Sequence, residues 1–218
     1  MAERPDQAVL ALPPPGDADG LAGVVARVAG VLAAGGTVVL PTDTVYGVAA
    51  SATVPGATSQ LFELKGRADA QPFAVLVADV EQATQLAVAG IVARRWMAER
   101  WPGPLTLVLP RRPEARGLAL GGDGATIGVR CPDHALVRAV AAAVGPLATT
   151  SANRHGEPTP TTALAAASSL TATVGLVVDG GPSSSVASTV VDATGDRWSV
   201  LRAGAIAPAD LGLDDSSG

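Results

Sequence analysis

A lysine and an arginine two positions apart, Lys65 and Arg67, are the residues whose types and spacing most directly suggest chemistry. Lys65 is the single lysine among 15 basic residues, and Gly66 would let both cations project from one tight turn. An ammonium on a flexible stem suits a phosphate or a developing anion, so the pair suggests electrostatic stabilisation of an anion. A helix end also attracts cations, and Lys65 could instead be an exposed residue that only complements a helix dipole.

Other polar segments follow expected strands and add hydroxyl and amide groups. They are PTDTVYG (41–47), TTSAN (149–153), SSSVAST (183–189) and LRAG (201–204). Each has an ordinary explanation as a turn, a cap or a linker. Together they offer hydroxyls, amides and few cations without a conspicuous base or nucleophile, and such a set binds anions.

The sequence excludes several familiar catalytic motifs. No Gly-rich run precedes Lys65, so there is no Walker A motif, and GGDGATIG (121–128) has Ile127 where a dinucleotide fingerprint needs glycine. No HExxH motif occurs. A hydrolase dyad of Ser151 and His155 stays an alternative, although Ser151 lacks the surroundings of a nucleophile elbow.

The composition limits the partners. A formal net charge of −5 and a pI near 4.9 argue against a broad nucleic-acid-binding surface, so we expect no stable nucleic-acid complex. Cys131 is the single cysteine, and with only His134 and His155 no Cys/His cluster can hold zinc. No apolar run reaches the roughly 20 residues of a membrane span, and no secretory signal is apparent. We therefore expect a cytoplasmic protein without membrane contact.

Strands and helices must alternate to position these segments. The strand-like runs lie at 37–40, 48–52, 73–78, 105–110, 126–130, 146–150, 175–179, 188–192 and 199–202. The helical patterns lie at 21–34, 58–66, 80–88, 91–101, 134–144 and 159–170. This alternation predicts an α/β layered domain around one mixed sheet. The last three strands follow too closely to hold helices between them and are expected to be antiparallel.

The ends of the chain differ in composition from its middle. Residues 1–20 are rich in proline and are expected to be a flexible leader, and residues 209–218 are expected to be a disordered tail. One domain over residues 21–208 remains, which is long enough to bury a single sizeable core.

The motifs, taken in order, resemble those of a known family. PTDTVYG, KGR followed by QPFAVLV, WPGPLTLVL, GVRCPDH, TTSAN, VDGG, STVVD and LRAG occur in the order found in the YrdC/Sua5 family, the threonylcarbamoyl-AMP synthases. The similarity runs from about Leu21 to Pro208. It implies a single YrdC-like α/β domain, in which a twisted mixed sheet with flanking helices presents a concave active-site face. It also implies the short form of the family, since longer members carry an additional C-terminal domain.

The resemblance implies a reaction as well. L-threonine, bicarbonate or CO2, and ATP would give L-threonylcarbamoyladenylate and pyrophosphate, with Mg2+ accompanying ATP. The product would pass to the downstream tRNA threonylcarbamoyl transferase machinery. Charge neutralisation is then the main catalytic task, and Lys65 and Arg67 are the expected catalytic residues, acting as preorganised electrostatic stabilisers.

By the same resemblance, two sets of residues form the site. The expected ATP-binding residues are Lys65, Arg67, Gln71, Thr126, Ser151, Asn153 and Arg202, with Ser151 and Asn153 donating to phosphate oxygens. The expected threonine-binding residues are Thr42, Thr44, Arg130, Thr149 and Ser188, with Arg130 as the partner of the carboxylate.

Some positions depart from the family pattern, and two other functions stay open. Ala68 stands where the family often has proline and Leu76 where some members have histidine, and these positions, with Gln71, affect the detailed contacts of the pocket. One alternative is an RNA-binding YrdC-like module, which the net charge disfavours. The other is a relative that handles carbamoyl adenylate, as in large hydrogenase-maturation proteins, whose acylphosphatase-like and zinc-finger segments are absent from this sequence.

Overall fold

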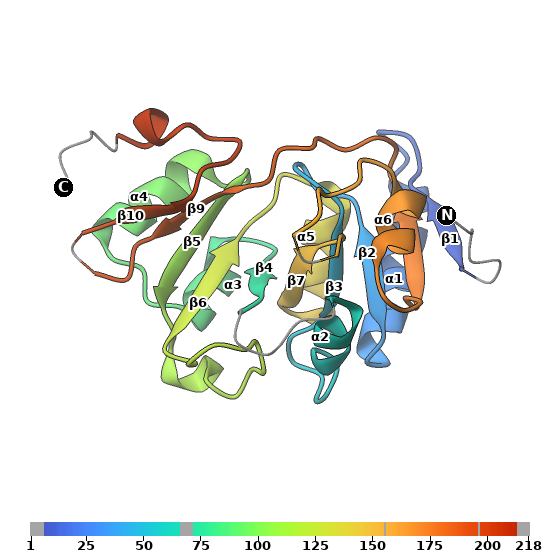
Figure 1. Ribbon diagram of the computed structural model, residues 1–218, viewed down its shortest axis with the longest axis horizontal. Coiled ribbons are helices and arrows are strands. Elements are labelled where there is room, and N and C mark those ends of the chain that lie inside the picture. Colours follow the sequence, from blue (N-terminus) through green and yellow to red (C-terminus); the bar gives the residue numbers. More distant parts are fainter. Residues whose placement is uncertain (1–6, 66–71, 155, 196, 213–218) are drawn as a thin grey trace.

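The computed structural model describes residues 7–65, 72–154, 156–195 and 197–212, and a ten-stranded sheet forms its centre (Figure 1). The strands are β1 (Val9–Ala11), β2 (Thr37–Leu40), β3 (Gly47–Ser51), β4 (Ala74–Leu76), β5 (Leu105–Pro110), β6 (Thr126–Arg130), β7 (Leu147–Ser151), β8 (Leu176–Asp179), β9 (Thr189–Asp192) and β10 (Ser199–Arg202). The helices are α1 (Ala18–Ala33), α2 (Ser59–Lys65), α3 (Val80–Leu86), α4 (Ile91–Arg100), α5 (Ala135–Val144) and α6 (Ala163–Ser169), with short 3-10 turns at Pro113–Ala115 and Pro208–Leu211.

The sheet mixes parallel and antiparallel pairs, in the order β1-β8-β2-β3-β7-β4-β6-β5-β9-β10. β2, β3, β7 and β4 form an antiparallel centre. Parallel pairs join β8 to β1 and β2, β4 to β6, and β5 to β9. The prediction of an α/β fold with a mixed sheet is therefore confirmed.

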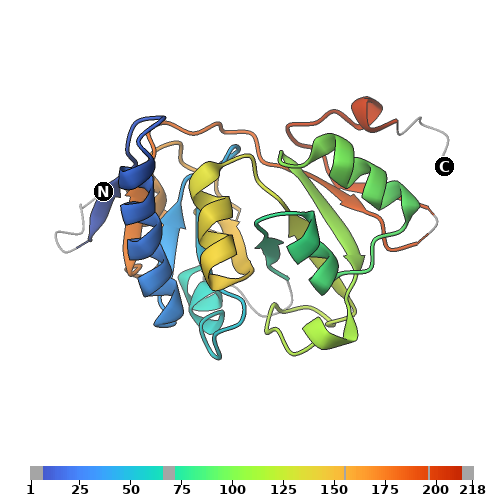
Figure 2. The same cartoon turned by 180° about the vertical axis from the view of Figure 1, so that it is seen from behind.

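Helices lie on both sides of the sheet. α1, α5, α3 and α4 cover the face seen in Figure 2, whereas α2 and α6 lie on the opposite face. α1 turns Val24, Val28 and Leu32 inward at intervals of four residues, and they pack in one cluster with Leu136 and Val140 of α5. One face of the sheet is thus covered by four helices, and α2 and α6 lie on the other.

The nine expected strands are all present, but the last three are not one antiparallel unit. Only β9 and β10 pair in this way, while β8 lies at the other end of the sheet, between β1 and β2. Residues 180–188 carry the chain across the top of the view in Figure 1. Nine extended residues can span roughly 30 Å, so the crossing needs no helix.

Part of the segment expected to be a flexible leader belongs to the fold. Val9–Ala11 form β1, which extends the sheet by parallel pairing with β8. α1 begins at Ala18, three residues earlier than expected, because the Asp17 side chain accepts a hydrogen bond from the backbone N–H of Gly20 at 2.8 Å. The β1 run was missed because three residues give too short a pattern to distinguish from a loop.

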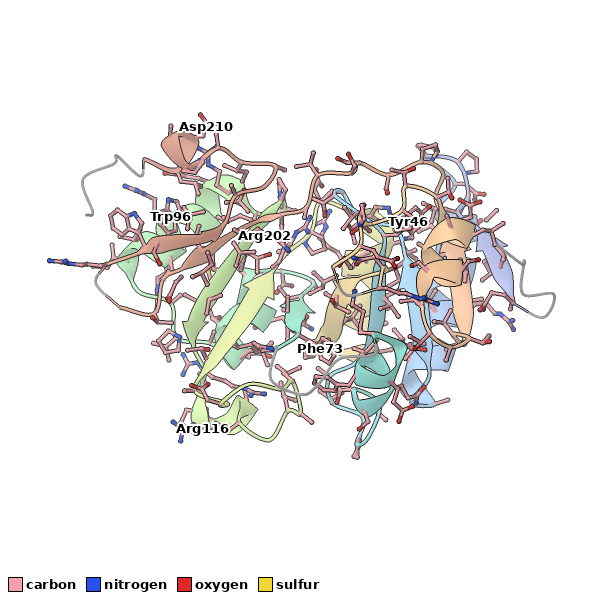
Figure 3. The ribbon with its side chains drawn as sticks, viewed as in Figure 1. Tyr46, Phe73, Trp96, Arg116, Arg202 and Asp210 are labelled. Atoms are coloured by element: carbon pink, nitrogen blue, oxygen red, sulfur yellow. The ribbon has the colours of Figure 1, made fainter. Side chains whose placement is uncertain are left out.

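The chain also stays packed beyond the expected domain end at residue 208. Leu211 is buried, and its carbonyl oxygen accepts a hydrogen bond from Trp96 Nε1 at 3.0 Å. Figure 3 shows Trp96 and Asp210 on the same side of the molecule. Across all the described ranges, none of the helices has both the length and the apolar character needed to cross a bilayer.

Candidate functional site

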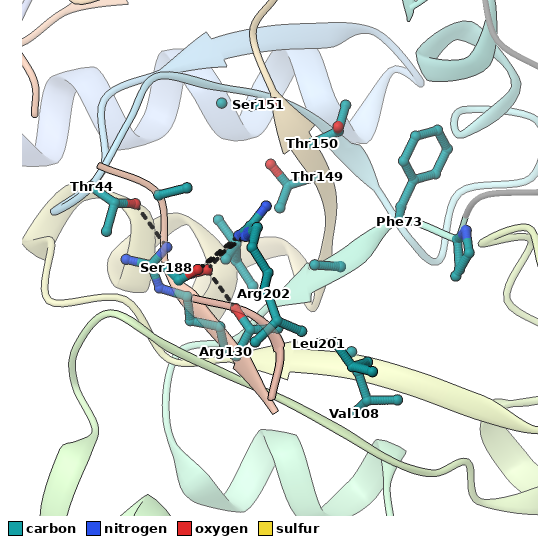
Figure 4. A pocket seen from close by; sticks show the side chains of 18 of the residues that line it. Thr44, Phe73, Val108, Arg130, Thr149, Thr150, Ser151, Ser188, Leu201 and Arg202 are labelled. Carbon is teal, nitrogen blue, oxygen red and sulfur yellow. Dashed lines mark hydrogen bonds between the residues drawn. The ribbon is translucent and has the colours of Figure 1, made fainter. Parts of the chain in front are cut away.

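A cavity of about 360 Å³ is lined by residues of β3 to β7, β9 and β10 and of the loops next to them (Figure 4). Its polar lining consists of Thr42, Thr44, Thr106, Thr126, Arg130, Thr149, Thr150, Ser151, Ser188 and Arg202. Its larger apolar lining residues are Val45, Phe73, Leu76, Val108, Leu120, Ile127, Val190 and Leu201. The segments that the sequence suggested for anion binding, at 41–47, 149–153, 183–189 and 201–204, all contribute to this cavity.

Strand periodicity explains which residues reach the cavity. Along β5, Leu105, Leu107 and Leu109 are fully buried in the core, so the alternate positions Thr106 and Val108 face the other way, into the cavity. The same alternation places Thr126 and Arg130 of β6 in the lining. The site is therefore built on rigid strands as well as on loops.

β10 departs from this alternation at the cavity. Its register with β9 shifts between Val200 and Arg202. Such an irregularity bends a strand and redirects a side chain, and here two consecutive residues, Leu201 and Arg202, both line the cavity. Arg202 thereby faces inward although Leu201 precedes it directly.

Arg130 is held in place by three neighbours. Its Nε donates to the carbonyl oxygen of Gly103 at 3.0 Å, one terminal nitrogen donates to Thr44 Oγ1 at 2.9 Å, and the other pairs with the carboxylate of Asp43. The side chain is only 5% exposed. A guanidinium carries five N–H groups, so each terminal nitrogen keeps one N–H beyond these contacts. That pair of donors suits a carboxylate.

Thr44 and Thr42 continue the chain of hydrogen bonds that begins at Arg130, and the donor and acceptor in each bond can be assigned. Thr42 Oγ1 donates to the carbonyl oxygen of Val45 at 2.7 Å. The 3.0 Å bond between Thr42 and Thr44 must then have Thr44 as donor, since Thr42 has only one hydroxyl hydrogen. Thr44 in turn accepts from Arg130, so both hydroxyls are committed to orienting the guanidinium.

Arg202, the second cation of the cavity, is hydrogen-bonded to Ser188. Its Nε and one terminal nitrogen donate to the carbonyl oxygen of Ser188 at 3.2 and 2.9 Å, and the latter also reaches Ser188 Oγ at 3.1 Å. Burial lowers the pKa of the Arg202 guanidinium, and the nearby charge of Arg130 lowers it further. Two neighbouring cations line a cavity whose described lining contains no carboxylate, so the site attracts anions.

Lys65 lies beside the cavity, not at the surface. It is 5% exposed, and its ammonium donates to the carbonyl oxygen of Ser151 at 2.8 Å, to that of Asn153, and to Asn153 Oδ1 at 3.0 Å. The alternative of an exposed cation at a helix end is therefore wrong, because α2 directs its last residue inward against β7. Lys65 fixes the segment that follows β7.

Ser151 and Asn153 are bonded within that segment. Ser151 Oγ donates to Asn153 Oδ1, and the amide nitrogen of Asn153 donates to the carbonyl oxygens of Arg154 and Glu157. Donation to phosphate oxygens, as the resemblance implies, would require the Ser151 hydroxyl to turn away from Asn153. Ser151 lines the cavity and can do so, whereas Asn153 is buried.

The structure gathers most of the expected site residues. Those that line the cavity are Thr42, Thr44, Thr126, Arg130, Thr149, Ser151, Ser188 and Arg202. Lys65 and Asn153 lie next to it, and Leu76 lines it. Four positions named from the sequence lie outside the residues that the structure describes, namely Arg67, Ala68, Gln71 and His155.

Sequence reasoning missed other residues of the site, above all Thr106, Phe73 and Asp43. Thr106 and Phe73 line the cavity, and Asp43 supports Arg130. A signal for Thr106 existed, because it is a polar residue in a strand whose alternate positions are all leucine. Asp43 belongs to the polar segment PTDTVYG, but nothing in the sequence pairs it with Arg130, 87 residues away.

Tyr46 ties the crossing segment 180–188 to the segment that carries Thr42 and Thr44. Its side chain is fully buried, and its hydroxyl donates to the carbonyl oxygen of Gly181 at 2.6 Å and accepts from the N–H of Gly180 at 3.1 Å. Burial raises the pKa of Tyr46, so the hydroxyl keeps its proton and remains a donor at neutral pH.

We expect Tyr46→Phe to lower the free energy of unfolding by about 1 to 3 kcal/mol, because it leaves a backbone donor and an acceptor without their partner. Urea unfolding followed by circular dichroism measures the effect. Thr171→Val is the control, since it removes an exposed hydroxyl-to-carbonyl bond to Glu63 and should cost much less. Equal losses in both variants would contradict the role given to Tyr46.

The remaining candidates for covalent or metal chemistry lie elsewhere. Burial raises the pKa of Cys131 to about 11, so its sulfur is a protonated thiol at neutral pH and no nucleophile. Among the described residues, no group of three histidine, cysteine or acidic side chains could hold a metal ion. The site can therefore bind and orient anions, and its described residues act through hydrogen bonds and charge.

Comparisons with known proteins show which proteins this chain resembles. The family model Sua5/YciO/YrdC, described as telomere recombination, matches residues 30–204. A threonylcarbamoyl-AMP synthase of Bacillus subtilis is 38% identical over 185 residues, which cover 84% of this chain and 54% of that protein. The chain thus spans about half the length of that relative. A putative threonylcarbamoyl-AMP synthase of Mycobacterium tuberculosis is 37% identical over 206 residues, 89% of this chain and 92% of that protein.

A solved structure is similar over nearly the same share of this chain. It is Pyrococcus abyssi Sua5 in complex with L-threonine, with a TM-score of 0.78 and 30% identity over 91% of this chain and 58% of that one. The likeness in fold therefore covers most of this chain.

Proposed function

Because the chain belongs to the Sua5/YciO/YrdC family, we propose that it is an L-threonylcarbamoyladenylate synthase, which condenses L-threonine, bicarbonate or CO2, and ATP. The observation that carries the proposal is a cavity in which Arg130 and Arg202 face one space among hydroxyl groups. Such a space accepts two anionic groups side by side, a carboxylate and a phosphate. The named relatives and the threonine complex of a similar structure support the same reading.

The amino acid binds at Arg130. Its α-carboxylate takes the two N–H groups of Arg130 that remain after Gly103, Thr44 and Asp43 are bonded. Thr149 and Ser188 border the same space. The network around Arg130 holds the guanidinium before the substrate arrives, and this preorganisation favours tight binding.

ATP binds toward Arg202, with Ser151 and Thr126 beside its phosphates. Val108, Val190 and Leu201 form an apolar wall near Arg202, and Leu201 is 58% exposed. An exposed leucine at the edge of a polar cavity suits the flat face of a nucleoside base. Mg2+ would accompany ATP and supply further positive charge at its phosphates.

The reaction needs charge control more than covalent catalysis. The amine of threonine attacks CO2, or bicarbonate with loss of water, and gives a carbamate. A carbamate oxygen then attacks the α-phosphorus of ATP, and the bond to pyrophosphate breaks. Arg202 offsets the negative charge that gathers at the reacting phosphorus, and the buried Lys65 ammonium, whose hydrogens are bonded to Ser151 and Asn153, adds its positive charge from beside the cavity. Delivery of the product to a tRNA-modifying transferase, and a cytoplasmic location, follow from the same proposal.

The test is an assay for pyrophosphate with ATP and with threonine and bicarbonate omitted in turn. Release should require both, because the attacking carbamate contains atoms of each. Pyrophosphate release at the full rate without threonine would overturn the proposal. Tight, sequence-selective binding of tRNA at physiological salt would instead favour an RNA-binding module.

Serine should be a poor substitute for threonine in the same assay. A pocket shaped around the threonine methyl loses roughly 1 to 3 kcal/mol when that methyl is absent. The measured quantity is the ratio of kcat/KM for the two amino acids, with glycine as a further comparison. Equal values for serine and threonine would contradict a threonine pocket.

A further inference from the structure

Thr106 has a place in the cavity that none of the expected substrate contacts accounts for. It is 5% exposed, it lines the cavity from β5, and its hydroxyl bonds to Ser188 Oγ at 2.9 Å. Ser188 lies next to both Arg130 and Arg202 in Figure 4. Thr106 is the second residue of β5, and Ser188 directly precedes β9, which pairs with β5 in parallel.

The hydrogens of this pair can be counted. Arg202 donates to Ser188 Oγ, which leaves that oxygen one hydrogen and one further acceptor site. Thr106 Oγ1 has no other hydrogen-bond partner within the described part of the chain. Whichever hydroxyl donates in the mutual bond, one hydroxyl hydrogen is left for a ligand in the cavity.

The charges around the pair decide what kind of ligand group takes this hydrogen. Arg130 and Arg202 are close enough for each other's charge to matter, and an anion between them relieves the repulsion. Such an anion accepts a hydrogen bond. If Thr106 donates to Ser188, the two acceptor sites of Ser188 Oγ are taken by Thr106 and Arg202. The hydroxyl hydrogen of Ser188 is then the one that is left for the anion.

We propose that Thr106 is a positioning residue, which aims the hydroxyl hydrogen of Ser188 at the α-carboxylate of the amino-acid substrate. This inference rests on the proposed function, because the carboxylate is that of threonine bound at Arg130. Thr106 acts through Ser188 and does not itself touch the substrate. Removing its hydroxyl therefore weakens binding of the amino acid and leaves binding of ATP unchanged.

The experiment compares Thr106→Val, which removes the hydroxyl and keeps the shape, with Thr106→Ser, which keeps the hydroxyl. Loss of one hydrogen bond within the site should raise the Kd and the KM for L-threonine by roughly 3- to 10-fold in Thr106→Val, with the KM for ATP within about twofold of wild type. Thr106→Ser should restore most of the loss. Thr37→Val, at a buried threonine of β2 away from the cavity, is the matched control and should change neither constant.

A double-mutant cycle with Ser188→Ala separates positioning from direct contact. If Thr106 acts through Ser188, Thr106→Val should add nothing to the loss caused by Ser188→Ala. Additive losses of threonine affinity in the double mutant would overturn the inference. So would wild-type affinity for threonine in Thr106→Val, or a loss in Thr106→Ser as large as that in Thr106→Val. A rise in the KM for ATP equal to that for threonine would overturn it as well.

Binding of threonine is measured by calorimetry, apart from turnover, so that two failures can be told apart. A wild type that binds threonine but releases no pyrophosphate contradicts the proposed synthase, and the cycle then still decides the role of Thr106. If the wild type turns over normally and Thr106→Val has the same affinity for threonine, only the inference about Thr106 is contradicted. A wild type that binds no threonine overturns both.

Discussion

Lys65→Ala is expected to slow adenylate formation by about 100- to 1000-fold, the loss that usually follows removal of a preorganised group that stabilises a developing anion. The structure adds a second cause, because the Lys65 ammonium holds the carbonyl oxygens of Ser151 and Asn153. Those acceptors would be left in the interior without their cation, at a cost of roughly 1 to 3 kcal/mol in the free energy of unfolding. Single-turnover formation of the adenylate and the thermal midpoint measure the two effects.

Two further variants separate charge from packing. Lys65→Met keeps the length of the side chain without its charge and should be as slow as Lys65→Ala, while Lys65→Arg should recover only part of the rate, because a planar fork cannot occupy the place of the ammonium. Arg27→Ala removes a cation from the exposed side of α1 and is the control, which should leave the rate of adenylate formation unchanged. Near-normal adenylate formation in a stably folded Lys65→Ala protein would remove Lys65 from the catalytic set.

The scaffold of this site followed closely from the sequence. β-branched and leucine-rich runs bounded by glycine, proline or aspartate predicted nine of the strands, and the six helices appear where apolar periodicity placed them. Helix starts were less accurate. α5 begins at Ala135, one residue after the start of the expected range 134–144, and α6 begins at Ala163, four residues after the start of the expected range 159–170. Local patterns mark the body of an element better than its ends.

The pairing of elements was harder to predict, because it depends on contacts between distant residues. β8 and β9 are ten residues apart in sequence yet lie in different halves of the sheet, and only the crossing segment 180–188, held by Tyr46, shows why. The same limit applies to the site. Types and spacing indicated an anion site, but not that Asp43 supports Arg130 or that Lys65 is buried against Asn153.

Arg130→Lys is expected to raise the KM for L-threonine by about 10- to 100-fold, because one ammonium cannot replace the geometry of the guanidinium. Arg130 reaches Gly103, Thr44 and Asp43 at once and still offers two N–H groups to a carboxylate. Lysine keeps the charge beside Asp43, whereas Arg130→Ala would leave that carboxylate without its cation, a change that commonly costs 3 to about 5 kcal/mol. The conservative variant therefore tests binding without unfolding the protein.

The decisive comparison is between the two substrates. If Arg130 binds the amino acid, the KM for ATP in Arg130→Lys should stay within about threefold of wild type, and Arg202→Lys should show the opposite preference. Arg27→Lys on α1 should change neither value, since it lies at an exposed position away from the cavity. An equal rise in both KM values in Arg130→Lys would mean that the two arginines hold one shared anion, and the separate carboxylate and phosphate positions proposed for this cavity would have to be abandoned.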